Sequence, residues 1–142
     1  MTDKIEVREY MSQESLLGHQ RIVPYLHYED ASAAVDFLCR VFGFKVKHRS
    51  EADDGTVLHA EVEFASNVVM LGTPRDAKNQ PKDRGVLLLC YVDDVDAHYA
   101  HAKAEGVEII TPLEDKPYGD RVYAAVDPEG HQWYFATRMK AV

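Results

Sequence analysis

The sequence has little cysteine and no long apolar run, and each absence excludes a class of protein. Its two cysteines in 142 residues do not form a C-x-x-C pair, so neither a disulfide framework nor a zinc ribbon is expected. The longest apolar run, residues 85–92, is far shorter than the roughly 20 residues that a membrane-spanning helix needs. Residues 1–20 mix both charges and lack an apolar core, which does not fit a secretory signal. We expect a cytoplasmic protein whose Cys39 and Cys90 are small buried hydrophobic side chains.

Positive charge is also scarce. The chain has 16 Lys and Arg against 24 Asp and Glu, a formal net charge of -8. A protein that follows a nucleic-acid backbone needs a basic stripe to displace counterions, and an anionic membrane attracts basic segments. We therefore expect no nucleic-acid partner and no membrane partner. The length fits one domain, and the 46% of hydrophobic residues is enough for a core.

One arrangement, a strand followed by a helix and three further strands, occurs twice in the chain. Asp30 or Ser32 can accept hydrogen bonds at the start of the first helix, and Gly43 suits its end. Asp94 and Gly106 occupy the same places in the second half, about 64 residues further on. The chain is therefore predicted to be a duplicated β-α-β-β-β unit. The predicted strands cover residues 22–28, 44–48, 57–64, 68–71, 86–92, 107–110, 121–126 and 132–137.

A single domain is predicted, with short segments on both sides of it. The polar segment between the repeats contains two prolines and no periodicity, so it is either a plain linker or a mobile loop at the site. The leader could add a strand or a short helix at a subunit contact. The predicted boundaries are 1–20 for the leader, 21–72 for unit one, 73–84 for the linker, 85–137 for unit two and 138–142 for the tail.

Two stretches of the chain carry a family resemblance. The first is IVPYLHYEDASAAVDFLCRVFGFKV, and the second contains V-D-D-V-D, E-G-V, G-D-R and D-P-E-G-H-x-W-x-F-A. They resemble the vicinal oxygen chelate superfamily of glyoxalases, bleomycin-resistance proteins and extradiol dioxygenases, and in particular its small glyoxalase-like bacterial members. The resemblance implies an α+β fold in which each unit curls its sheet into half a cup, with helices on the outer faces. Two half-cups, within one chain or across a homodimer, would enclose a cavity for a small-molecule ligand.

Metal-dependent members of that superfamily hold a divalent ion with His, Gln or Glu at four strand positions. By the resemblance, these positions fall on Val23, Glu61, Leu87 and Tyr134. Only Glu61 carries a good ligand, or His59 if the register slips by two, and one carboxylate cannot hold zinc or iron against water. We therefore expect no metal cofactor. A displaced divalent-metal site of His27, His59 and Glu61 is the alternative, and a hydrogen-bonded polar patch is the plainer interpretation. His98 and His101, on the second helix, lack a partner at ligand spacing and are expected to have a solvated or helix-edge role.

Aromatic and charged residues near the expected cup are the candidate ligand-binding groups. Tyr134 is expected to face the cavity with its polar tip, whereas Trp133 should pack in the core. Arg121, oriented by Asp120, could bind an anionic group, and a surface ion pair is the structural alternative. The candidate ligand-binding residues are Tyr25, His27, Leu87, Tyr91, Arg121 and Tyr134.

Two functions remain open at this point. In the first, the protein binds a small organic molecule in an aromatic-lined cup without the usual metal, which needs only a concave apolar pocket with a few polar groups. In the second, it is a glyoxalase-like lyase or isomerase in which Glu61, helped by His59, takes a proton next to a carbonyl. A displaced metal or Arg121 would then stabilise the enolate. A salt bridge from Glu61 to a basic residue of the neighbouring strand is the structural alternative, and the scaffold alone cannot choose between functions.

Overall fold

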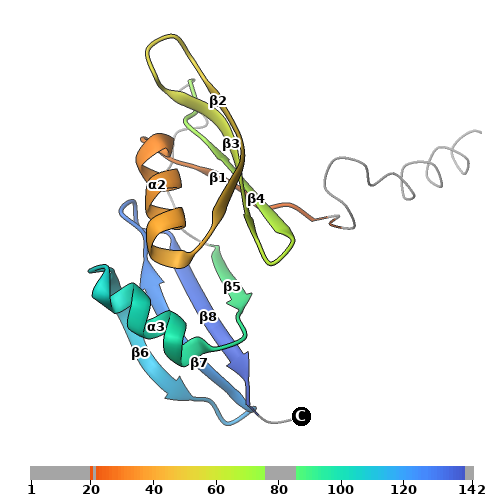
Figure 1. Ribbon diagram of the computed structural model, residues 1–142, viewed down its shortest axis with the longest axis vertical. Helices are drawn as coiled ribbons and strands as arrows, with labels where there is room; N and C mark the ends of the chain where they lie inside the picture. The colour runs from red at the N-terminus through yellow and green to blue at the C-terminus, as the bar shows by residue number, and fades with distance from the viewer. Residues whose placement is uncertain (1–19, 21, 76–85, 140–142) are drawn as a thin grey trace, which may run out of the picture.

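The structure is a computed structural model that describes residues 20, 22–75 and 86–139 of the chain. Most of the predicted leader and most of the predicted linker lie outside the described residues, as does the end of the tail. Within them the strand–helix–strand order occurs twice (Figure 1). The first repeat contains β1 (Tyr25–His27), α2 (Ala31–Phe42), β2 (Lys45–Glu51), β3 (Val57–Phe64) and β4 (Asn67–Gly72). The second contains β5 (Leu87–Tyr91), α3 (Val95–Ala104), β6 (Glu108–Asp115), β7 (Asp120–Val126) and β8 (Gln132–Arg138).

The two repeats form two four-stranded sheets with the same connections. The strand orders are β1-β4-β3-β2 and β5-β8-β7-β6. In each sheet the first strand pairs in parallel with the last, and the other pairs are antiparallel. This confirms the predicted α+β fold of two β-α-β-β-β units.

A constant offset of 64 positions relates the hydrogen bonds at the helix starts. The backbone N–H of Ala31 donates to the hydroxyl of Thr73, and the N–H of Val95 donates to the hydroxyl of Thr137, both at 3.0 Å. The carboxylates of Asp30 and Asp94 accept from the third residue of the capped turn in both repeats, as expected for N-caps. The repeat is therefore a repeat of contacts as well as of elements.

One strand boundary differs from the prediction in an informative way. The sequence predicts that the strand from 107 ends before Thr111 and Pro112, but β6 continues through both to Asp115. β6 is an edge strand, so Pro112 can lack its N–H without breaking a ladder on both sides. Its pairing with β7 shifts register between Ile109 and Thr111 and again before Glu114. The proline is accommodated by irregular pairing at the sheet edge.

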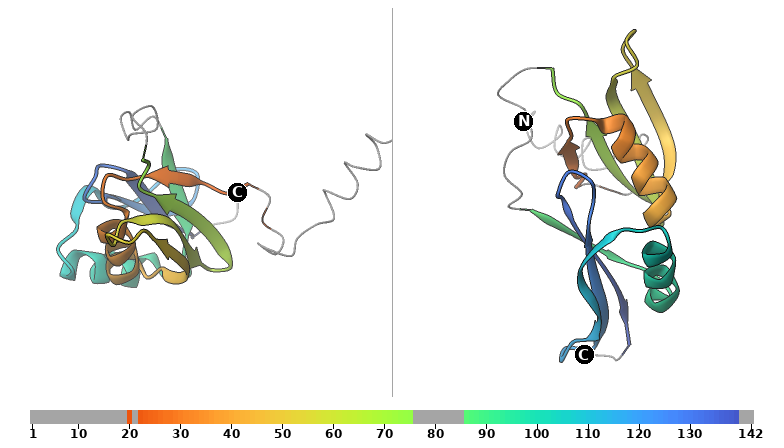
Figure 2. Two further views of the ribbon diagram at one scale, coloured as in Figure 1. Left: turned by 90° about the horizontal axis from the view of Figure 1, so that it is seen from above. Right: turned by 90° about the vertical axis from the view of Figure 1, so that its left-hand side faces the viewer.

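The two sheets lie end to end, with both helices on one side of them (Figures 1 and 2). The core lies between the helices and the sheets. The ring of Phe42, at the end of α2, contacts Trp133 and Phe135 of β8, with centroid separations of 5.8 and 4.8 Å. All three side chains are fully buried, which confirms Trp133 as a core residue. No helix among the described residues is long and apolar enough to cross a membrane.

The histidines of α3 join the repeats, so the expected solvated or helix-edge role fits the exposed His101 but not His98. The ring of His98 lies between the hydroxyl of Tyr123, 2.6 Å from Nδ1, and the carbonyl oxygen of Phe42, 3.0 Å from Nε2. His101 is exposed, and its Nε2 lies 3.1 Å from the carbonyl of Arg40. Both rings therefore reach carbonyls of the last turn of α2, which have no partner within the helix.

The D-P-E-G-H turn has a structural role that accounts for its composition. The buried carboxylate of Asp127 accepts from the hydroxyl of Tyr28 at 2.7 Å and from the indole N–H of Trp133 at 3.1 Å. The carboxylate of Glu129 accepts from the backbone N–H groups of Glu29 and Asp30. The turn of the second repeat thus holds the start of α2 in the first.

Candidate functional site

Each sheet has a face that points away from the helices, which we name the first and the second cup face. On the first, the register aligns Tyr25 of β1 with Met70 of β4 and Met70 with Glu61 of β3. The next row on the same face runs from His27 through Gly72 towards His59. The first cup face therefore gathers four of the predicted site residues, namely Tyr25, His27, His59 and Glu61.

Three of these side chains form a hydrogen-bonded chain. The hydroxyl of Tyr25 lies 3.1 Å from Nδ1 of His59, and Nε2 of His59 lies 3.2 Å from Oε2 of Glu61. With the Nε2–H tautomer, His59 donates to Glu61 and accepts from Tyr25. Desolvation raises the pKa of Tyr25, so the phenol stays protonated at neutral pH. The polar patch that the sequence allowed is the arrangement that forms.

Gly72 makes room for this chain. A Cβ atom at this position would lie 3.1 Å from the hydroxyl of Tyr25 and 2.3 Å from the carbonyl oxygen of Leu58. The second contact is far too short and involves backbone. The missing side chain therefore lets the phenol of β1 reach across β4 to the imidazole of β3.

The pairing register changes one of the four positions assigned to a family metal. Leu89 of β5 aligns with Tyr134 of β8, as Tyr25 of β1 aligns with Met70 of β4. Met70 is thus the position equivalent to Tyr134, and Glu61 lies one strand further on. The set becomes Val23, Met70, Leu87 and Tyr134.

This corrected set does not fit a divalent ion. Val23 and Leu87 carry no donor atom, Met70 carries a thioether, and Tyr134 carries a phenol. Zinc and iron sites use thiolate, imidazole and carboxylate ligands instead. Among the described residues no group of three or more His, Cys, Asp or Glu is arranged to hold a metal, and His27, His59 and Glu61 make no such group.

The second cup face is apolar and aromatic along β5. Leu87, Leu89 and Tyr91 of β5 are each about half exposed, at 48%, 50% and 49%. Tyr134 of β8 lies on the same face beside Leu89. Two of the predicted ligand-binding residues, Leu87 and Tyr91, therefore accompany Tyr134 here, on a different sheet from the Tyr25–His59–Glu61 chain.

Arg121 does not face either cup. Its guanidinium donates to Asp115 at 2.7 Å and to Asp96 of α3 at 3.1 Å, so it lies on the helix side of β7. Asp120, its expected partner, points to the opposite face and binds Arg138 and Tyr91 instead. The surface ion pair is the arrangement that forms, and Arg121 cannot stabilise an enolate beside Glu61.

Sequence reasoning missed Arg138. It lies on β8 at the same alternation as Tyr134 and pairs directly with Asp120. Its Nε donates to one oxygen of the buried Asp120 carboxylate, while the hydroxyl of Tyr91 donates to the other at 2.6 Å. Counting in steps of two from Tyr134 would have placed Arg138 on the second cup face.

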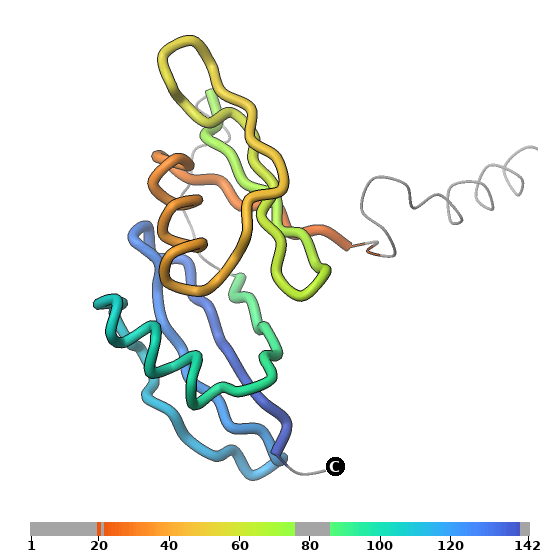
Figure 3. Tube along the Cα trace, in the orientation of Figure 1, coloured from red at the N-terminus to blue at the C-terminus, as the bar shows by residue number. Residues whose placement is uncertain are grey.

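A cavity of about 400 Å³ lies where the two repeats meet. It is lined on one side by β5, including Leu88 and Cys90, and on the other by Phe64 and Val68 near the β3–β4 turn. Figure 3 traces that turn running beside β5. Burial raises the pKa of Cys90 to about 11, so its thiol is unreactive and behaves as the small hydrophobic group that was expected.

Comparison with known proteins agrees with this architecture. A family model described as "Glyoxalase/Bleomycin resistance protein/Dioxygenase superfamily" matches residues 20–135. An uncharacterised protein of Mycobacterium bovis is 30% identical over 131 residues, which cover 84% of each chain. The crystal structure of TioX from Micromonospora sp. ML1 is 36% identical with a TM-score of 0.71, covering 84% of this chain and 99% of that one.

A more distant structure shows the same fold. A family enzyme from Burkholderia phytofirmans PsJN is 18% identical with a TM-score of 0.69, covering 82% of this chain and 97% of that one. The family model covers most of the chain, and the two sheets repeat the same strand order. The chain belongs to the glyoxalase/bleomycin resistance protein/dioxygenase superfamily.

Proposed function

We propose that this protein binds a small organic molecule against its cup faces, without the metal that many members of its superfamily use. The observation that carries the proposal is the apolar second cup face, where Leu87, Leu89 and Tyr91 are half exposed on one strand. Contiguous exposed apolar groups with a few polar tips are typical of ligand sites. Tyr134 supplies such a tip, whereas the hydroxyl of Tyr91 is bonded to Asp120.

The donor chemistry supports the metal-free part of the proposal. Val23, Met70, Leu87 and Tyr134 offer no carboxylate, imidazole or thiolate. Elemental analysis of protein purified without chelators should find no stoichiometric metal, and Zn, Ni, Mn and Fe should leave the melting temperature unchanged. A stoichiometric metal that is lost on changing His59 or Glu61 would overturn the metal-free part. Native mass spectrometry of the same sample would reveal a co-purified ligand and its mass.

We also propose that a second copy of the chain completes the site. Both cup faces open away from the helices, and they lie end to end within one chain (Figure 1). Apolar groups just before β1 and β5 are strongly exposed, with Ile22 at 87% and Val86 at 67%. Light scattering should therefore give a dimer mass, and Leu89→Asp should shift the protein to monomer. A monomeric wild type would contradict the homodimer.

The Tyr25–His59–Glu61 chain supports a second candidate, a proton-transfer enzyme. Glu61 would take a proton from the carbon next to a carbonyl and return it, and the phenol of Tyr25 would turn its O–H from His59 to the enolate oxygen. In D₂O this cycle exchanges the methylene protons of hydroxyacetone for deuterium, which NMR follows. Exchange above buffer that is lost in Glu61→Gln and kept in Glu63→Gln would favour the enzyme. Exchange no faster than buffer would remove this candidate.

A further inference from the structure

The second cup face holds one arginine whose setting differs from that of the others. Of the described arginines, Arg49 and Arg121 bond to residues of α2 and α3 on the helix side of their sheets. Arg40 lies on α2 and Arg75 follows β4, and both form ion pairs with exposed acids. Arg138 alone among them lies on a cup face.

Hydrogen bonds to Asp120 and Tyr91 fix the orientation of the Arg138 side chain. Its Nε donates to Asp120, whose side chain is about 2% exposed, and its Nη2 lies 3.4 Å from the hydroxyl of Tyr91. Both carboxylate oxygens of Asp120 are thereby used, one by Arg138 and one by Tyr91. A guanidinium fixed in this way loses little further entropy when it binds a ligand.

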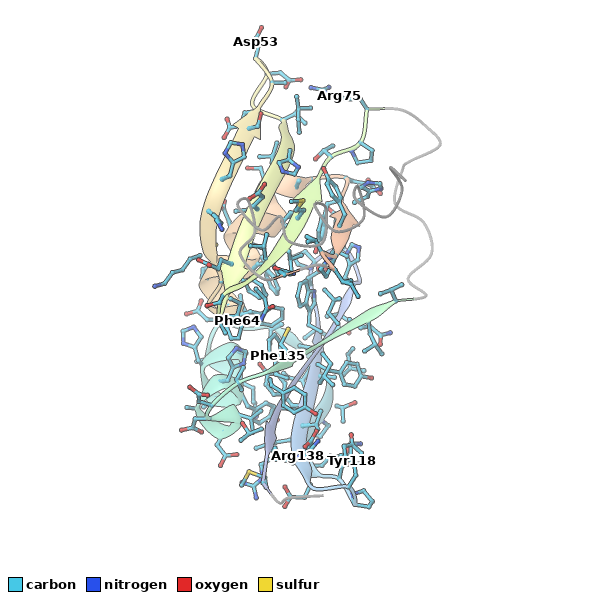
Figure 4. All side chains as sticks on the ribbon, turned by 90° about the vertical axis from the view of Figure 1, so that its right-hand side faces the viewer. Asp53, Phe64, Arg75, Tyr118, Phe135 and Arg138 are labelled. Carbon is cyan, nitrogen blue, oxygen red and sulfur yellow. The ribbon has the colours of Figure 1, made fainter. Side chains whose placement is uncertain are left out.

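One edge of the guanidinium remains available. Nη1 of Arg138 has no hydrogen-bond partner among the described residues, and the side chain is 44% exposed. The backbone N–H of Met139 donates to the carbonyl of Gly119, which places Arg138 beside the β6–β7 turn. Figure 4 shows Arg138 and Tyr118 together at that end of the second sheet.

Along β5 and β8 the neighbours of Arg138 are apolar or aromatic, and the Lys116–Glu114 ion pair lies near Tyr134 on the other side of the face. Tyr91 and Leu89 of β5 lie on the same face. Tyr134 lies four residues before Arg138 on β8, and its side chain points to the same face. A ligand that extends along this face would meet an apolar, aromatic wall and then the guanidinium. A planar donor fork of this kind suits carboxylate and similar anions.

We propose that Arg138 anchors the anionic group of the ligand, a carboxylate or an equivalent acid, while the apolar part of the ligand lies on Leu89, Tyr91 and Tyr134. The inference rests on the proposed binding function and adds the ligand class, an organic acid with an apolar or aromatic body. It also gives the buried Asp120 a role as the positioning residue of the anchor.

The test uses 1-naphthoate and its neutral counterpart 1-naphthalenemethanol as probes, titrated against the full chain by calorimetry and NMR. Wild type should bind the acid about tenfold more tightly than the alcohol, the gain of one charged hydrogen-bonded contact. Arg138→Gln should remove this preference and leave binding of the alcohol unchanged. Arg121→Gln, the control on the helix side of the neighbouring strand, should keep the preference.

Arg138→Lys covers the case in which the glutamine variant fails to fold, because it keeps the charge beside Asp120. It should lose part of the preference, since an ammonium lacks the planar fork. Equal binding of acid and alcohol by wild type, or a full preference in Arg138→Gln, would overturn the anchor and leave the proposed function standing. Binding of neither probe would overturn both the anchor and an aromatic site on this face.

Discussion

The imidazole Nε2 of His98, on α3, lies 3.0 Å from the carbonyl oxygen of Phe42, the last residue of α2. The other ring nitrogen lies 2.6 Å from the hydroxyl of Tyr123. A neutral ring can donate to the carbonyl and accept from the phenol at once, whereas a protonated ring still donates to the carbonyl but can no longer accept from the phenol. The hydrogen bond that His98 accepts from Tyr123 therefore depends on the neutral imidazole.

This dependence predicts a loss of stability in mild acid. Desolvation lowers the pKa of His98 below 6.5, although the Phe42 carbonyl acts in the opposite direction. The unfolded chain then binds a proton at higher pH than the folded one, so the contribution of His98 is complete above about pH 6.5 and declines as the pH falls below it. Urea unfolding at pH 7.5 and 5.5 should show a smaller difference in unfolding free energy for His98→Gln than for wild type. The exposed His101→Gln is the control and should keep the wild-type difference.

The Asp127 carboxylate gives a prediction about stability at neutral pH. Burial alone would raise its pKa, but hydrogen bonds from His131, Tyr28 and Trp133 hold the pKa below its ordinary value. Asp127→Ala leaves buried donors without an acceptor and should cost about 3–5 kcal/mol of unfolding free energy. Asp53→Asn, at an exposed hairpin turn, should change it by less than about 0.5 kcal/mol. An Asp127→Ala variant as stable as this control would contradict the role of the turn.

Local chemistry explains why the fold could be predicted from the sequence. Asp30 and Asp94 cap helices through contacts three residues away, and apolar and polar residues alternate from Leu58 to Phe64. Such signals lie within a few residues of each other, so no knowledge of the tertiary structure is needed. Pro112 misled the prediction because its cost depends on whether the strand is at an edge, which only the sheet order decides.

The site was harder to predict because it depends on which strands are neighbours. By strand alternation, the side chains of both Glu61 and Met70 point to the first cup face. Only the pairing register shows that Met70 is the residue equivalent to Tyr134 of the second repeat. Counting back 64 residues, the offset between the repeats, from Tyr134 would have identified Met70. Arg121 lies on the helix side of β7, whereas Arg138 lies on the cup face of β8. Because side chains alternate along a strand, an error of one residue in the register of β7 assigns Arg121 to the wrong face.

The repeated threonines give a prediction that tests the internal symmetry. Thr73→Val and Thr137→Val each remove the hydroxyl that accepts from the first helical N–H. Thr137 also donates to the carbonyl of Val92 at 2.7 Å, so its loss should cost about 1–2 kcal/mol, against about 1 kcal/mol for Thr73. Serine at either position should restore most of the loss in urea unfolding. Equal stability of valine and threonine would mean that these contacts contribute nothing.

Gly72 gives the sharpest prediction about the first cup face. Gly72→Ala brings a methyl group 2.3 Å from the Leu58 carbonyl and 3.1 Å from the Tyr25 hydroxyl, so backbone must move, at a cost of about 1–3 kcal/mol. Tyr25 should also leave His59, which the ¹⁵N shifts of the imidazole would report. Tyr25→Phe is the matched variant, because it removes the same hydrogen bond with no backbone clash. It should reproduce the change in the His59 shifts while costing less than about 1 kcal/mol at this half-exposed position. If Gly72→Ala leaves both the stability and the His59 shifts unchanged, the close approach of Tyr25 across β4 does not exist in solution.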